Sequence, residues 1–346
     1  MSDESTHEKA LGGKLLASVS RSFYLTLKAL PRVVREPISL AYLLARAADT
    51  IADTTQVPAD VRLQSLARFR DLILGPPDEN EERSLGIFLQ GRFCPHQTDE
   101  AEARLMGHVR DALAWLRTVG PSQLTAIRGV LEHIIRGQML DIERYPGDGR
   151  LRALATGTEL DDYIWLVAGC VGEFWTKLCL SDLPSAFVPG TTPDDLIDSG
   201  IRYGKGLQLI NILRDLPKDI DAGRCYLPEE ELKKLSRNLV EVRLSPLVLD
   251  PLRATWLAVC EEHLAHGLRY IQSISDAKLR YATALPLLIG VRTAALLRNS
   301  RWEHLAAGIK VSRLEIAKLL ADTAIACRDS TKIKRLYEKL SGNPAM

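Results

Sequence analysis

The sequence lacks paired cysteines, a strong net charge and any long apolar run. Its 346 residues carry 45 Lys and Arg against 44 Asp and Glu, a formal net charge of +1. No global field attracts a polyanion, and no local basic stripe replaces it, so we expect no nucleic-acid partner. The six cysteines, at positions 94, 170, 179, 225, 260 and 327, stand singly. That spacing argues against a disulfide framework and a zinc ribbon, and it favours a reducing cytoplasm.

Signals for export and membrane insertion are missing as well. The first ten residues, MSDESTHEKA, are polar and mixed in charge, so no secretory signal is expected. The longest apolar stretches, such as residues 284–291, fall short of the ~20 residues that span a bilayer. We therefore expect a cytoplasmic protein with no transmembrane segment, whose contact with a membrane is at most peripheral.

No stretch alternates strictly between apolar and polar residues, whereas nearly every segment has apolar residues three and four positions apart. This periodicity predicts an all-α fold. Glycine- and proline-rich breaks divide the chain into helices, and no low-complexity linker separates two halves. The sequence thus predicts one domain over residues 1–346, with a flexible N-terminus over about 1–10 and a tail over about 335–346. The polar stretch 76–102 is expected to be a mobile surface excursion.

One expected helix carries two aspartates, Asp49 and Asp53, four positions apart on one face among Leu, Ala and Ile. Two like charges at this spacing repel, and apolar neighbours add a desolvation cost. A hard divalent cation would offset both effects, because Mg²⁺ takes carboxylate oxygens together with water and phosphate oxygens. The pair therefore predicts a magnesium site.

A second acidic pair repeats the spacing in residues 208–224, QLINILRDLPKDIDAGR. Steps of three and four place Gln208, Asn211, Asp215 and Asp219 on one helix face. Pro217 is expected to distort the helix near its end, before the chain turns and brings Arg224 beside the acids.

A third pair, Asp194 and Asp198, serves as a control. It follows a Thr192-Pro193 cap, where carboxylates favour the helix dipole, so a structural role is expected for it. The other two pairs lie beyond the first turn and have arginines nearby, more than local ion pairing requires; a bound diphosphate would use the excess. These arginines are Arg21, Arg46, Arg214 and Arg224.

Four segments in order resemble the signatures of the head-to-head prenyl synthases, the squalene and phytoene synthase family, over nearly the whole chain. They are SRSF at 20–23, YLLARAADTIAD at 42–53, YIWLVAGCVG at 163–172 and the segment 208–224. The resemblance implies an isoprenoid-synthase helical bundle, in which the two Asp-x-x-x-Asp helices face each other across a central cavity. It also implies two farnesyl diphosphate molecules as substrates, with Mg²⁺ and NADPH as cofactors.

Residue roles follow from the same resemblance. Tyr163 matches the family tyrosine that handles protons and steadies the carbocation, although a buried tyrosine with a satisfied hydroxyl is the alternative. The small residues Ala168, Gly169 and Gly172 allow close approach of either substrate or a neighbouring helix. The implied Mg²⁺ ligands are Asp49, Asp53, Asp215 and Asp219; the implied diphosphate-binding residues are Ser20, Arg21, Arg46, Gln208, Asn211, Arg214, Arg224 and Tyr226; and the implied channel residues are Phe23, Tyr42 and Pro286.

The implied reaction forms presqualene diphosphate and then reduces it with NADPH to squalene. No G-x-G-x-x-G motif follows a strand, so a nicotinamide site would not be Rossmann-like. Lys310 and Arg313 resemble the family's cofactor-phosphate element, from which Ser312 departs, and a solvated helix start explains them as well. The rival products are presqualene diphosphate, dehydrosqualene and phytoene. A non-catalytic helical binding or assembly protein is the rival from another class.

Two weaker features have structural interpretations. His263 and His266, three positions apart, are expected to be a helix surface rather than a metal site. Cys225 is expected to be a packing cysteine despite the neighbouring Arg224.

Overall fold

The computed structural model describes residues 11–20 and 23–342. The expected flexible N-terminus (1–10) and Arg21 lie outside the described residues. Contacts divide the chain into two compact units, one running to Pro146 and including Lys177–Leu183, the other comprising Gly147–Thr176 and the chain from Pro184 onward. The expectation of a single domain over 1–346 stays a prediction.

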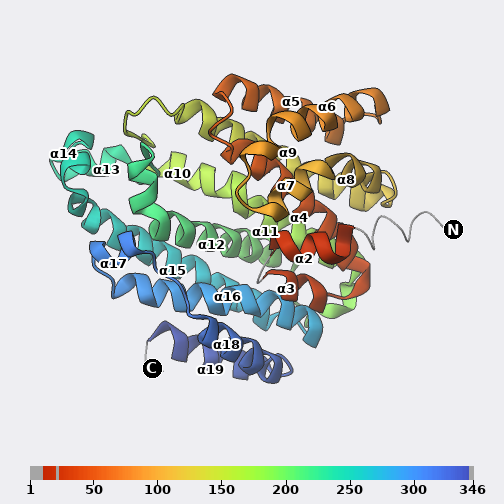
Figure 1. Ribbon diagram of the computed structural model, residues 1–346. Coiled ribbons are helices and arrows are strands. Elements are labelled where there is room, and N and C mark those ends of the chain that lie inside the picture. Colours follow the sequence, from red (N-terminus) through yellow and green to blue (C-terminus); the bar gives the residue numbers. More distant parts are fainter. Residues whose placement is uncertain (1–10, 21–22, 343–346) are drawn as a thin grey trace. The chain divides into compact units, whose positions relative to one another are not determined.

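The first unit is built from helices (Figure 1, red to yellow). Helix α4 packs against α5, α7, α8 and α9. Its buried residues, such as Leu40, Leu43, Leu44, Ala47 and Ile51, recur at the three-and-four spacing seen in the sequence. The elements are η1 (Leu11–Leu15), α2 (Leu16–Ser20), α3 (Phe23–Ala29), α4 (Arg32–Asp53), α5 (Ala59–Leu74), α6 (Glu79–Arg92), η2 (Cys94–His96), α7 (Glu100–Gly107), α8 (Val109–Leu116) and α9 (Pro121–Arg144).

The expectation of an irregular excursion over 76–102 is wrong. Asp78 caps α6 by accepting hydrogen bonds from the backbone amides of Asn80 and Glu81, and α6 buries Leu85 and Leu89 completely. The stretch has few apolar residues because one narrow stripe of α6 faces the core, and that stripe was too sparse to register as periodicity.

The second unit is centred on long helices, and one of its helices, α11, continues after Thr176 into the first unit. Helix α12 packs against both α15 and α16 (Figure 1, green to blue). The elements are β1 (Arg152–Ala153), α10 (Gly157–Ile164), η3 (Trp165–Gly169), α11 (Cys170–Asp182), η4 (Pro184–Ala186), α12 (Pro193–Asp221), β2 (Arg224–Cys225), α13 (Glu229–Lys234), α14 (Leu239–Leu244), η5 (Pro246–Leu249), α15 (Asp250–Gln272), α16 (Ala277–Arg298), α17 (Trp302–Ala307), α18 (Arg313–Ala326) and α19 (Ser330–Ser341).

The all-α prediction is confirmed, since the named strands in the described residues are β1 and β2, two residues each and paired in parallel. Helix α12 begins as predicted, with the Thr192 hydroxyl accepting from the backbone amide of Asp195 at 3.4 Å. Pro217 lies inside α12, which continues to Asp221. Of the expected C-terminal tail (about 335–346), residues 335–341 belong to helix α19, and residues 343–346 lie outside the described residues.

One helical run, Gly157–Asp182, is long and apolar enough by length and composition to cross a membrane. Its middle packs closely on α12 instead. A Cβ added at Gly172 would lie 1.9 Å from the backbone oxygen of Gly200, and one at Gly204 would lie 2.3 Å from the backbone oxygen of Ala168. Close helix packing therefore accounts for Gly172 and Gly204, because only hydrogen fits where the two backbones approach.

Candidate active site

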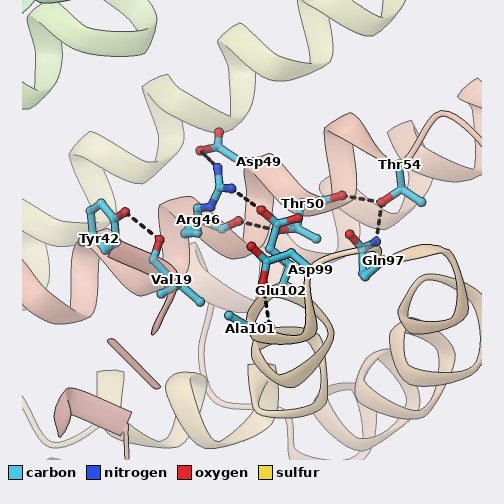
Figure 2. A network of polar contacts seen from close by, with 10 residues as sticks. All are labelled: Val19, Tyr42, Arg46, Asp49, Thr50, Thr54, Gln97, Asp99, Ala101 and Glu102. Atoms are coloured by element: carbon cyan, nitrogen blue, oxygen red, sulfur yellow. Dashed lines mark hydrogen bonds and ion pairs between the residues drawn. The ribbon is translucent and has the colours of Figure 1, made fainter. Parts of the chain in front are cut away.

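The α4 cluster, defined here as Arg46, Asp49, Asp53, Glu102 and Gln138, surrounds the first acidic pair. Arg46 binds the carboxylate of Glu102 on α7 and lies 3.7 Å from Asp49, measured from Nη1 to Oδ2. Figure 2 shows Arg46 between these two carboxylates. The side-chain amide of Gln138, on α9, donates a hydrogen bond to Oδ1 of Asp49.

The chain holds Glu102 in place through a local cap. Asp99 accepts a hydrogen bond from the backbone amide of Ala101 at 2.8 Å, which fixes the first turn of α7 (Figure 2). Thr50 and Thr54 bond to carbonyls one turn earlier on α4, at 2.9 and 2.6 Å. These contacts order the polar side of α4 around the aspartates.

The carboxyl of Asp49 has an altered affinity for protons. Burial raises its pKa to about 7, and the negative charge of Asp53 adds to the rise, while Arg46 and Gln138 oppose it. The Asp49 side chain is nevertheless 43% exposed to solvent, so a small ion can reach its carboxylate. Asp53 is exposed at the end of α4.

The α12 cluster, defined here as Gln208, Asn211, Arg214, Asp215, Asp219 and Arg224, contains the second pair. The Arg214 guanidinium donates two hydrogen bonds to the Asp215 carboxylate, from Nε at 3.1 Å and from Nη2 at 2.6 Å. Asp219 is 8% exposed and accepts a hydrogen bond from Arg224 at 2.8 Å. Gln208 accepts from Asn211 at 3.3 Å, one turn earlier on the same face.

The expected surplus of arginines is not found among the described residues. Arg46, Arg214 and Arg224 each hold a carboxylate of their own cluster. The charges differ between clusters, since the α4 cluster has three carboxylates and one arginine, whereas the α12 cluster has two of each. The α4 cluster is thus the more anionic of the two.

The donor chemistry of both clusters fits Mg²⁺. Within residues 11–20 and 23–342, no group of three or more His, Cys, Asp or Glu side chains could by itself hold a metal ion. Mg²⁺ needs no such cage, because it is usually bound by one or two carboxylates with water and substrate phosphates completing the shell. A bound Mg²⁺ would offset the electrostatic repulsion between the carboxylates of Asp49 and Asp53.

Two aromatic pairs accompany the clusters. The rings of Tyr163 and Tyr226 stack with centroids 5.0 Å apart and planes 18° apart, and both residues are buried. The rings of Phe23 and Tyr42 lie 5.2 Å apart, and the Tyr42 hydroxyl bonds to the Val19 carbonyl at 3.3 Å. Tyr226 therefore contacts Tyr163, a relationship that the sequence did not reveal. A π-helical turn, η3, begins at Trp165, two residues after Tyr163.

The other expected site residues lie apart from these contacts. The Ser20 hydroxyl bonds to the Leu16 carbonyl one turn earlier, at 2.5 Å. Pro286 is half-buried inside α16. Lys310 and Arg313 are exposed before and at the start of α18. Ser312 caps that helix by accepting from the backbone amide of Glu315, which gives this departure from the family element a structural role.

Burial raises the pKa of Cys225 to about 12, as expected for a packing cysteine. The expectation that His263 and His266 form a helix surface is wrong, because His263 is buried against Gly206 and His266 is half-buried. Burial, with Lys205 as the next cause, lowers the pKa of His263 to about 4.

Sequence reasoning missed Gln138 and Glu102. Gln138 lies on α9 between Arg136 and Asp141 and is itself buried. A buried amide needs a partner, but its burial follows from tertiary packing, so the sequence held no clear signal for it. Glu102 held none, because it lies in the polar stretch that was taken for an irregular excursion.

Known proteins resemble this chain over most of its length. The family model described as squalene/phytoene synthase matches residues 16–315. A squalene synthase from Botryococcus braunii is 26% identical over 332 residues, covering 89% of this chain and 62% of that protein. A presqualene diphosphate synthase from Rhodopseudomonas palustris is 30% identical over 227 residues, covering 66% of this chain and 65% of that protein.

A solved structure of TcSQS in complex with the ligand E5700 has the same fold. It aligns with a TM-score of 0.71 at 20% identity and covers 98% of this chain and 97% of that one. This chain spans about three fifths of the length of the first curated relative. The match of the family model over residues 16–315 shows that the chain belongs to the squalene/phytoene synthase family.

Proposed function

We propose that this protein condenses two molecules of farnesyl diphosphate head to head, in a Mg²⁺-dependent reaction, and then reduces the product with NADPH to squalene. The proposal is carried by one observation: each Asp-x-x-x-Asp helix forms, and each sets arginine against its carboxylates. Such paired anionic and cationic groups bind a metal diphosphate, with carboxylates on the ion and guanidinium forks on the phosphate oxygens.

The metal-holding residues in this proposal are Asp49 and Asp53 on α4, and Asp215 and Asp219 on α12. Bound Mg²⁺ would supply Lewis-acid charge that makes diphosphate a better leaving group. Gln138 fixes one Asp49 oxygen through its amide, which orients the carboxylate before an ion arrives. One nitrogen of the Arg46 guanidinium binds Glu102 rather than Asp49. The Asp49 carboxylate therefore remains able to bind an ion.

The chain's own residues must also manage a reactive carbocation. In the first step one farnesyl diphosphate loses pyrophosphate, the double bond of the second molecule attacks the allylic carbon, and loss of a proton closes the cyclopropane of presqualene diphosphate. Tyr163 is the proposed proton handler, and its ring is stacked on Tyr226. Both rings are buried, and a proton handler in a dry environment would suit a cation that water would quench.

The second step releases the remaining pyrophosphate, rearranges the skeleton and adds a hydride from NADPH to give squalene. Lys310 and Arg313 are the proposed contacts to the cofactor phosphate, and both are exposed to solvent. Ser312 supplies a helix cap between them instead of a further cation.

Presqualene diphosphate as the final product is a second candidate. It is favoured by the relative that is 30% identical and carries that name. The assay that separates the candidates incubates purified protein with farnesyl diphosphate and Mg²⁺, with and without NADPH, and identifies the products. Squalene that forms only when NADPH is present supports the proposal. Presqualene diphosphate under both conditions supports the second candidate. Phytoene from the C20 diphosphate, or no turnover of either substrate, rejects the proposal.

A further inference from the structure

The two short strands of the second unit place two arginines side by side. Strands β1 and β2 pair in parallel, with Arg152 in register with Arg224. The backbone amide of Arg152 donates to the Gly223 carbonyl at 3.0 Å, and that of Leu154 donates to the Cys225 carbonyl at 3.1 Å. Residues in register on neighbouring strands point to the same face, and the strands lie about 4.8 Å apart. The Arg152 side chain therefore begins next to that of Arg224.

Contacts on both sides of β1 hold this pairing. After the strand, the backbone amide of Glu229 donates to the Leu154 carbonyl at 2.8 Å. Before the strand, the Arg243 guanidinium donates to the Gly149 carbonyl at 2.6 Å. The backbone position of Arg152 is therefore fixed from both ends.

The two guanidinium groups bind carboxylates of different kinds. Arg224 donates to Asp219 at 2.8 Å, and Asp219 is 8% exposed and belongs to the α12 cluster. Arg152 donates from Nη1 and Nη2 to the two oxygens of Asp148, both at 2.6 Å. The Asp148 side chain is 41% exposed, in the segment between α9 and β1. An exposed ion pair contributes little to stability because water screens it, so a more highly charged anion can replace Asp148 on Arg152.

The charges of the α12 cluster favour such an anion beside β2. The two arginines of that cluster are balanced by its two aspartates, so the cluster by itself has no spare positive charge. A diphosphate with one Mg²⁺ keeps a net negative charge, and a guanidinium fork matches its phosphate oxygens. Once Asp148 is displaced, Arg152 supplies the missing cation.

We propose that Arg152 binds the diphosphate held at the α12 cluster, beside Arg224, and that Asp148 occupies Arg152 until the diphosphate arrives. This inference rests on the proposed function and adds a substrate-binding residue to its site. Arg152 lies outside the four segments that carry the family resemblance, so the sequence did not point to it.

The rival account makes the ion pair between Arg152 and Asp148 a purely structural clasp. The two accounts differ in the sign of one effect. If Asp148 competes with the diphosphate, removing its charge strengthens diphosphate binding. If the pair only holds the segment before β1, removing either partner weakens binding or leaves it unchanged.

Calorimetric titration of the full chain with inorganic pyrophosphate, at a fixed Mg²⁺ concentration, tests the proposal without any turnover. We expect Arg152→Gln to raise the Kd of pyrophosphate about tenfold, because a charge-assisted contact is lost. We expect Asp148→Asn to lower that Kd about threefold, because the competing charge is gone while the size of the side chain is kept. If circular dichroism shows that Arg152→Gln does not fold, Asp148→Asn alone decides the matter.

Arg202→Gln is the matched control. Arg202 also pairs with an aspartate four positions earlier, Asp198, at 3.1 Å, and both side chains are exposed. Its replacement removes the same charge from the second unit and should leave the Kd of pyrophosphate within about twofold of the unaltered chain. An equal loss of affinity in Arg202→Gln and Arg152→Gln would show a general effect of charge and overturn the proposal.

Two other outcomes would overturn it as well: unchanged affinity in Arg152→Gln, and unchanged or weaker binding in Asp148→Asn. Asp215→Asn separates this inference from the proposed function. If Asp215→Asn weakens pyrophosphate binding and Arg152→Gln does not, the inference alone is wrong. If the unaltered chain binds no pyrophosphate, both the inference and the diphosphate site of the proposed function are wrong.

Discussion

Gln138 on α9 donates its side-chain amide to the carboxylate of Asp49 on α4. This bond joins two helices of the first unit at a residue whose pKa is raised to about 7, with burial as the main cause. It orients the carboxylate and favours its ionised form, because an amide donor stabilises negative charge. Gln138 is therefore a positioning residue for the proposed magnesium site.

Replacing Gln138 by Leu should weaken the response to Mg²⁺. Without the amide, the pKa of Asp49 rises further, so the acidic limb of the pH–activity profile should move to higher pH. We expect kcat/KM at neutral pH to fall about 10- to 100-fold, as found for partners that orient metal ligands. Gln97→Leu is the control, because Gln97 bonds to Thr54 and the Phe93 carbonyl rather than to Asp49. An unmoved pH limb and unchanged Mg²⁺ dependence in Gln138→Leu would show that the bond is only structural.

Asp49→Asn should change the pH dependence of stability in EDTA. The folded pKa of Asp49 is about 7 against an ordinary 3.8, so between these values the folded state binds more protons than the unfolded state. The free energy of unfolding therefore falls as pH rises through this window, and this contribution is absent in Asp49→Asn. Urea denaturation at several pH values should find the variant more stable than the unaltered chain at pH 8 and similar to it near pH 4. If Asp49→Asn is less stable than the unaltered chain at pH 8, the ionised Asp49 carboxylate does not destabilise the folded state and the account is wrong.

Tyr163→Phe should lower turnover while the fold remains. The phenyl ring keeps the stacking on Tyr226 and loses only the proposed proton-handling hydroxyl. We expect kcat to fall about 100-fold, as for removal of a general acid–base group, with little change in KM. The matched control is Tyr203→Phe, since Tyr203 is also buried and its hydroxyl bonds to the Thr283 carbonyl at 3.0 Å. The control should lose about 1 kcal/mol of stability but keep its turnover. Equal turnover in Tyr163→Phe and the unaltered chain would favour a purely structural tyrosine.

Gly172→Ala should destabilise the second unit. The added Cβ would lie 1.9 Å from the Gly200 carbonyl oxygen, and a backbone atom cannot move aside as a side chain can. We expect a loss of about 3 kcal/mol in the free energy of unfolding, at the upper end for overpacking. Gly86→Ala on α6 meets its nearest atom at an ordinary 3.9 Å and should gain up to about 1 kcal/mol from helix propensity. Thermal denaturation of both variants distinguishes close backbone packing from spare room for substrate at Gly172.

The sequence predicted the helical class and the acidic helices because local periodicity determines both. Asp49, Asp53, Asp215 and Asp219 recur at one-turn spacing, and the Thr192 cap marks where α12 begins. The stretch 76–102 was misjudged because α6 has so few buried residues that local composition resembles a loop. The pairing of Arg46 with Glu102, 56 residues away, depends on tertiary packing that no local pattern encodes. The same is true of the stacking between Tyr163 and Tyr226. That the two acidic helices face each other across a cavity stays a prediction.

The most direct measurement is pyrophosphate release from farnesyl diphosphate as Mg²⁺ is titrated. It compares the unaltered chain with Asp49→Asn, Asp215→Asn and the control Asp198→Asn, whose carboxylate pairs with Arg202 on an exposed surface of α12. If both acidic helices hold the metal diphosphate, release requires Mg²⁺, falls at least about 1,000-fold in each of the first two variants and stays within about twofold in the control. Release without Mg²⁺, or near-normal release by Asp215→Asn, would contradict a reaction that depends on both helices.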